Sequence, residues 1–158
     1  MRLYPGQYFG LFERLDDVIV STRLQAAYHV FNIVEVFLDR VERDAPYTYE
    51  ALLSILLDGM DTMQDLLDYA DGIQERFQRW WETAGRDTDF AQPGKVYYGD
   101  VTLLEVLERT GWHSGQHTRQ LALVVESLGL EPDRPLTDAD FAGLPMPNEV
   151  WDNEKTFD

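Results

Sequence analysis

The stretch Thr110-Gly111-Trp112-His113-Ser114-Gly115-Gln116-His117-Thr118-Arg119-Gln120-Leu121 contains two of the three histidines in this 158-residue chain. His113 and His117 are four residues apart, which is about one turn of an α-helix, so a helix would place both imidazoles on one face. The same spacing continues on either side of the pair at Leu103, Val106, Thr110, Leu121, Val124 and Leu128. Because this face is mostly apolar, we predict a long helix whose two histidines point toward the protein interior.

Signals for the ends of this helix lie where the apolar pattern begins and stops. Asp100 or Thr102 can cap the start, and Thr102 and Glu105 have the spacing of a capping box. Gly129 can end the helix, because glycine readily adopts the left-handed conformation found just after a last helical turn.

The third histidine, His29, lies on a second predicted long helix. Residues 24–43 carry apolar side chains at intervals of three and four, and His29 falls on that apolar face near the start. Ser21 or Thr22 can cap the beginning, and Asp44-Ala45-Pro46 marks the end. Two helices therefore direct all three histidines inward.

The sequence after residue 61 predicts another long helix followed by a polar connection. Residues 62–85 have a clean helical pattern that includes Phe77, Trp80 and Trp81, an aromatic cluster more typical of a core than of a pocket or subunit interface. Residues 86–100 read as a polar connection.

Shorter segments complete the fold prediction. We expect a short helix at residues 9–20, a short apolar helix or an interrupted longer one at 49–57, and a helix of one or two turns starting at 137–140. Trp151 is expected to anchor the tail by burial. No segment alternates with period two, so the chain is predicted to be all-α, most simply an antiparallel helical bundle.

Composition narrows the function classes. The length suits a single domain over residues 1–158, and a net charge of −16 argues against binding nucleic acid or anionic membranes. There is no cysteine, hence no disulfide framework, thiolate nucleophile or cysteine metal site. Neither a signal-peptide pattern nor an apolar run of about 18 residues is present, so we expect a cytoplasmic protein.

The histidines are candidate metal ligands. Neutral imidazole binds borderline divalent metals, and catalytic zinc commonly uses three protein ligands with a fourth position open. His29 could complete a site begun by His113 and His117. Gly111 and Gly115 each cost up to about 1 kcal/mol inside a helix, and such glycines often mark the close approach of a neighbour or ligand. The alternative is that the three histidines are hydrogen-bonded core residues in a metal-free scaffold.

Other catalytic readings are weaker. A metalloprotease site of the H-E-x-x-H type needs glutamate directly after the first histidine, and Ser114 occupies that position. Ser114 and Thr118 lack a visible paired base, so neither is a convincing nucleophile. Glu35, Glu105 and Glu108 are possible acids, but solvated carboxylates on helix surfaces are the more common case.

Several motifs together resemble the DinB-like superfamily. They are His113-x-x-x-His117-x-x-Gln120-Leu121 preceded by Leu103-Leu104-Glu105-Val106-Leu107, the isolated histidine in Ala27-Tyr28-His29-Val30-Phe31, and the tail over residues 135–152. The resemblance implies a four-helix bundle in which His29, His113 and His117 bind a divalent metal, most often zinc or nickel. It also implies a homodimer, an ordered C-terminal extension over 131–158, and activities such as metal-dependent transfer involving a small thiol or maleylpyruvate isomerisation.

Two departures from the family pattern qualify these expectations. Gln116 stands where the family often has another histidine, which limits the candidate ligands on this helix to His113 and His117. Residues 1–20 look too short and broken for the family's long first helix, so the bundle groove could be left open or be covered by a partner subunit. The expected function is a metal-dependent transferase that acts on a small molecule with a thiol cosubstrate. The alternative is a non-enzymatic, metal-stabilised or metal-sensing dimeric bundle.

Overall fold

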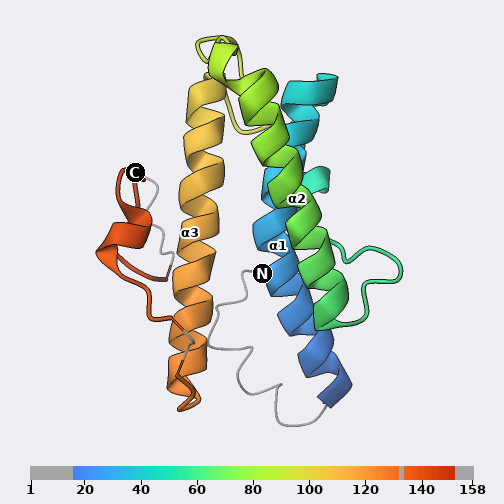
Figure 1. The fold of residues 1–158 in the computed structure, drawn as a ribbon, viewed down its shortest axis with the longest axis vertical. Helices are drawn as coiled ribbons and strands as arrows, with labels where there is room; N and C mark the ends of the chain where they lie inside the picture. The colour runs from blue at the N-terminus through green and yellow to red at the C-terminus, as the bar shows by residue number, and fades with distance from the viewer. Residues whose placement is uncertain (1–15, 132–133, 152–158) are drawn as a thin grey trace.

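The computed structural model describes residues 16–131 and 134–151 and shows a bundle of helices (Figure 1). The α-helices in this part of the chain are α1 (Asp16–Arg43), α2 (Met63–Thr83) and α3 (Leu103–Ser127), and no strand is present in it. Short 3-10 helices cover Glu50–Leu52 (η3), Gly85–Asp87 (η4) and Asp138–Phe141 (η5). The all-α prediction is confirmed, and no helix among these residues is long and apolar enough to cross a membrane.

The directions of the helices differ from a simple antiparallel arrangement. α3 runs antiparallel to α1, as expected, but α2 runs parallel to α1 (Figure 1). Tyr69 near the start of α2 bonds to Glu35, and Arg76 further along bonds to Asp39 and Glu42, so both helices advance together. The cause is the connection at 44–62, which returns the chain along the bundle before α2 begins.

Two of the three α-helices in the described part of the chain, α2 and α3, begin at a threonine that caps the first turn. Thr62 and Thr102 each form a reciprocal capping box with the acidic residue three positions later, as the sequence predicts for α3. The predicted start of the first long helix at Ser21 or Thr22 is wrong, because α1 already begins at Asp16. Serine and threonine cost less than about 0.7 kcal/mol each inside a helix, so they need not begin one. The part of the predicted 9–20 helix before residue 16 lies outside the described residues.

The predicted helix at 49–57 is also wrong. Only Glu50–Leu52 forms a single 3-10 turn. Ser54 has a φ of 52°, a left-handed conformation that cannot continue a right-handed helix, and its side chain bonds back to α1 instead. This segment therefore lies beside His29 as irregular chain.

The core lies where all three helices meet. Phe37 and Leu38 of α1 are completely buried, together with Val106 of α3. Trp80 of α2 packs edge-on against Phe37 and is buried, which confirms the core interpretation for this member of the aromatic cluster. Trp81 is instead partly exposed.

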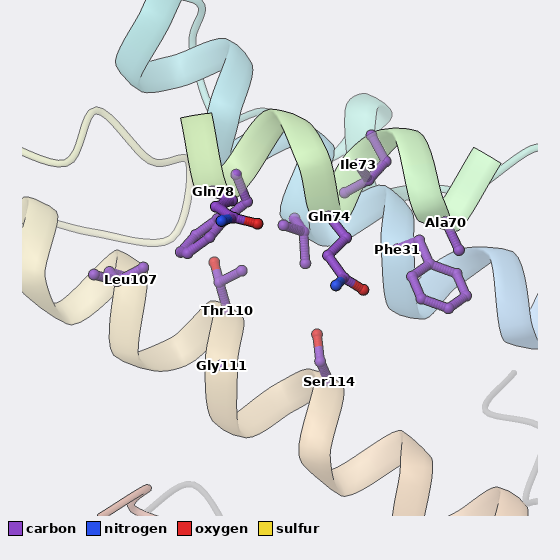
Figure 2. Close-up of a pocket in the computed structure, with 11 residues that line it drawn as sticks. Phe31, Ala70, Ile73, Gln74, Gln78, Leu107, Thr110, Gly111 and Ser114 are labelled. Atoms are coloured by element: carbon purple, nitrogen blue, oxygen red, sulfur yellow. The ribbon is translucent and has the colours of Figure 1, made fainter. Parts of the chain in front are cut away.

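An apolar groove runs between α2 and α3, which each pack along α1 (Figure 2). Its volume is about 400 Å³. The lining comes from all three helices and includes Phe31, Val34, Ile73, Phe77, Leu107 and Thr110. Among the described residues nothing covers this groove, and the expectation of a short or missing first helix falls largely on residues 1–15, which lie outside them.

The C-terminal segment lies along α3 and is fixed by polar side chains of that helix (Figure 1). Gln116 is buried and donates to the backbone carbonyls of Glu149 and Val150. Arg119 donates to the Pro147 carbonyl at 2.8 Å. The prediction that Trp151 anchors the tail by burial is wrong, because 41% of its surface is exposed. Hydrogen bonds from α3 side chains to backbone carbonyls of the tail hold it in place.

Candidate metal centre

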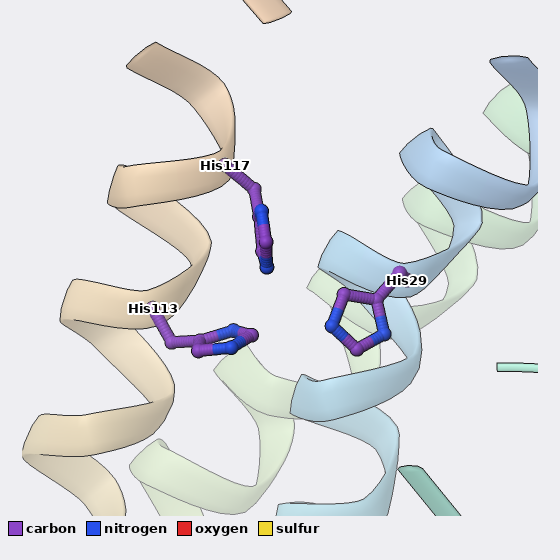
Figure 3. Close-up of side chains that lie close together, drawn as sticks. All are labelled: His29, His113 and His117. Atoms are coloured by element: carbon purple, nitrogen blue, oxygen red, sulfur yellow. The ribbon is translucent and has the colours of Figure 1, made fainter. Parts of the chain in front are cut away.

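The three histidines meet between α1 and α3 (Figure 3). His113 and His117 project from successive turns of α3 with ring centroids 4.4 Å apart, and His29 faces both from α1 at 5.3 and 5.0 Å. One nitrogen from each ring lies within 4.8 Å of the other two. The predicted convergence of these side chains is therefore confirmed.

The antiparallel packing of α1 and α3 produces this convergence. Ser114, the residue after His113, donates to the Val30 carbonyl, the residue after His29, at 3.3 Å. This direct contact brings the two helix backbones together at the level of the rings. Ser114 therefore contributes to helix packing, and its hydroxyl is used in that contact.

Hydrogen bonds fix the orientation of two rings. His117 Nδ1 lies 2.7 Å from Gln120 Oε1, which can only accept, so Nδ1 carries the proton and Nε2 is left with a lone pair. His29 Nδ1 bonds to Ser54 Oγ, whose own proton is directed to Asn32 Oδ1 or the Leu52 carbonyl. Such outer partners are typical of metal-ligating histidines, because they set the tautomer and the direction of the free nitrogen.

Two ring nitrogens in this cluster are buried without any hydrogen-bond partner. They are Nδ1 of His113 and Nε2 of His117. A buried polar atom without a partner costs about 1–3 kcal/mol, so the arrangement is unfavourable for a plain core. Two nitrogens at about 2 Å from a tetrahedral ion are roughly 3.3 Å apart, and a small inward movement of the rings would allow them to share one ion. The donor set and its geometry thus fit a divalent transition metal.

Electrostatics also favour neutral imidazoles at this site. Burial, assisted by His117, lowers the pKa of His29 to about 4. Burial, with both neighbouring rings and Arg109, lowers the pKa of His113 to about 3. These two rings are therefore unprotonated at neutral pH, as a metal ligand must be.

A small cavity opens directly beside the triad. It has a volume of about 190 Å³, and His29 and His113 form part of its wall. The rest of the lining consists of Ile33, Tyr47, Tyr49, Leu52, Tyr97 and Arg109. A molecule in this cavity would contact two of the three candidate ligands.

The other polar residues singled out in the sequence have structural roles. Glu35 accepts from Tyr69, and Glu105 completes the α3 capping box. Gln116 points to the C-terminal tail, in agreement with its exclusion as a ligand. Gly111 and Gly115 do mark a close approach, but the neighbour is the tail: a Cβ at Gly115 would lie 3.2 Å from Met146 Sδ.

Sequence reasoning missed Ser54, Gln120 and Arg109 as members of the site. Gln120 and Arg109 lie three and four residues from a histidine, a helical spacing that could have identified them. Ser54 gave no such signal, because it reaches His29 only through an irregular loop.

The fold and site define a class of helical-bundle proteins with an inward-facing group of three histidines able to hold a metal ion. The chain belongs to the DinB superfamily, whose family model matches residues 16–121 and therefore includes all three histidines. Comparisons with curated proteins and with solved structures gave no match.

Proposed function

We propose that this DinB-superfamily protein is a cytoplasmic, divalent-metal-dependent transferase that uses a small thiol as cosubstrate. In this proposal His29, His113 and His117 hold zinc or nickel. The observation that carries it is the convergence of three half-buried imidazoles, two of which have a buried nitrogen without a partner. Three protein ligands leave a coordination position free for a substrate group.

The chain's own residues provide orientation and a confined space. A bound divalent ion would supply Lewis acidity and lower the pKa of a thiol or water at its free position. Ser54 and Gln120 hold two of the ligand rings in a fixed tautomer. A small substrate in the adjacent cavity would contact His29 and His113. Since the chain has no cysteine, the thiol would come from a second molecule.

Metal analysis of three variants tests the site itself. We expect one bound divalent ion in the wild-type protein and little or none in His29→Ala and His117→Ala. Thr118→Ala is the matched control, because this neighbour is exposed and its hydroxyl donates only to the Ser114 carbonyl. Full metal retention in both histidine variants would refute the site.

Thiol use is tested with the metal-loaded protein. We expect glutathione, cysteine or 2-mercaptoethanol to change the near-ultraviolet spectrum of the cobalt-substituted protein. We also expect the loss of free thiol in the presence of an electrophile to stop when a chelator is added. Intact metal binding with neither effect would leave the metal site standing and reject the thiol transferase.

The alternative function is a non-enzymatic, metal-stabilised or metal-sensing homodimer. The open apolar groove between α2 and α3 favours it, because a second copy could cover that surface. Metal at 100 times its dissociation constant should then stabilise the fold by about 2.7 kcal/mol. Dimer dissociation on chelation, without turnover of any thiol tested, would support this alternative.

A further inference from the structure

Arg109 stands out among the arginines of the described chain. Arg40, Arg76 and Arg119 are likewise buried or half-buried, and each donates to carboxylate or carbonyl oxygens. Arg109 is half-buried, yet within the described residues no carboxylate forms an ion pair with it. In a chain with 29 acidic residues and a net charge of −16, a half-buried cation without an acidic partner needs an explanation.

Aromatic rings hold the Arg109 guanidinium in place. Its central carbon lies 4.8 Å from the ring centre of Tyr98 and 5.4 Å from that of Trp112. In both contacts the charge lies over the face of an aromatic ring, which offers no acceptor oxygen to the guanidinium. Arginine has five N–H donors, and within the described residues none of those of Arg109 donates to an oxygen, so they are available to an acceptor.

Arg109 lines the same cavity as two candidate metal ligands. It precedes His113 by four residues and therefore lies one turn away on the same face of α3. An acceptor bound to Arg109 would have the remainder of its molecule directed along the cavity toward His29 and His113. The cavity volume of about 190 Å³ is below the roughly 300–1,000 Å³ of sites for drug-sized ligands, so the molecule must be small.

The charge of the site selects the anion. The fork of N–H groups on arginine matches the two oxygens of a carboxylate. A single guanidinium balances one negative charge, and the middle of α3 offers no free backbone N–H groups for further phosphate oxygens. The chain's net charge of −16 disfavours an anion that carries more charge than Arg109 neutralises.

We propose that Arg109 anchors the carboxylate of a small, singly charged substrate whose other end reaches the histidine triad. The carboxylate site stands on the geometry of Arg109 and its cavity. Only the statement about the other end rests on the proposed function.

Metal-free protein tests the carboxylate site alone. Calorimetric titration with benzoate and with benzamide, its neutral counterpart of similar size, should show benzoate binding at least about ten-fold more tightly, as expected for a charge-assisted hydrogen bond. Arg109→Gln should remove this preference, and Arg109→Lys should keep part of it. Arg79→Gln, at an exposed arginine of α2, is the matched control and should change nothing.

Cobalt-loaded protein tests the direction of the bound molecule. Titration with 3-mercaptopropionate and 3-mercaptopropionamide, followed by near-ultraviolet absorption, should show that Arg109→Gln weakens the acid about ten-fold and changes the amide less than two-fold. Equal effects on both thiols would overturn the proposed direction.

The two titrations distinguish a failure of the metal proposal from a failure of the Arg109 proposal. If the protein binds no cobalt but retains an Arg109-dependent preference for benzoate, the metal proposal fails and the carboxylate site stands. Equal binding of benzoate and benzamide by the wild-type protein would overturn the Arg109 proposal, whatever the metal result. The same holds if Arg109→Gln retains the full benzoate preference while unfolding at the same urea concentration as the wild type.

Discussion

Replacing Ser54 by alanine removes one hydroxyl that orients a metal-ligand candidate without touching the three imidazoles. Ser54 Oγ bonds to His29 Nδ1, and its own proton goes to Asn32 or the Leu52 carbonyl. Without it, His29 loses the partner that directs its other nitrogen toward the triad. We expect the variant to fold and to bind metal more weakly.

The magnitude follows from the contacts that are lost. Removing an outer-shell partner of a ligating histidine typically weakens metal affinity 10- to 100-fold, which corresponds to about 1.4–2.7 kcal/mol. Because Ser54 is buried, the metal-free protein should also lose about 1–3 kcal/mol of unfolding free energy as buried polar groups lose their partner. Both effects should be measurable in one variant.

The assay is zinc competition against a chromophoric chelator, combined with urea unfolding of the metal-free protein. Ser54→Gly separates the hydroxyl from the backbone, because glycine readily adopts the φ of 52° found here. It should lose as much metal affinity as Ser54→Ala while losing less stability. Ser127→Ala, at an exposed serine near the end of α3, is the control and should leave affinity unchanged. Wild-type affinity in both Ser54 variants, with affinity lost in His29→Ala, would refute the orienting role.

Three further predictions concern α3 and pH. Gln120→Glu keeps an acceptor for His117 but loses the donor to the Val150 carbonyl. Competition titration should therefore show unchanged zinc affinity, and limited proteolysis should show a more accessible tail. Gln120→Ala removes both bonds and should weaken zinc binding as well as expose the tail. Gly115→Val would force side-chain atoms into the tail and should cost about 1–3 kcal/mol in urea unfolding, whereas Gly72→Ala, in open space on α2, should stabilise by up to about 1 kcal/mol. In the folded protein the pKa is about 4 for His29 and about 3 for His113, both below the usual 6.5, so the unfolded state binds more protons below pH 6.5. The melting temperature of the metal-free protein should therefore fall as the pH drops from about 6.5 to 4. A melting temperature that stays constant over this range would contradict the prediction.

The parts of the fold that could be read from the sequence are those determined by local chemistry. The capping box at Thr102 and the glycine at 129 bounded α3 correctly, and the apolar spacing located α2. The direction of α2 was not readable in this way, since it depends on where the loop at 44–62 takes the chain. The error at 49–57 has a similar origin, because the bonds of Ser54 to distant residues outweigh the helical pattern of its neighbours.

In the candidate site, too, features set by local helical spacing were predictable and features set by distant segments were not. Helical spacing was sufficient to place His113 and His117 together, and an inward-facing position on a second helix was sufficient to nominate His29. Spacing could not supply the outer partner Ser54, which comes from an irregular segment. Nor could it show that Arg109 has no acidic partner among the residues that the structure describes, because pairing of a charged side chain depends on every element that packs around it.

α3 therefore contacts α1 on one side and the C-terminal tail on the other. One side carries the histidines toward α1, and the other holds the tail through Gln116 and through contacts at Gly115. Gln120 joins the two sides, since its carbonyl oxygen accepts from His117 while its amide nitrogen donates to the Val150 carbonyl at 2.9 Å. One side chain thus couples the orientation of a candidate metal ligand to the position of the tail. A movement of the tail that breaks the second bond frees this amide to turn, and the direction of the His117 lone pair would then no longer be fixed.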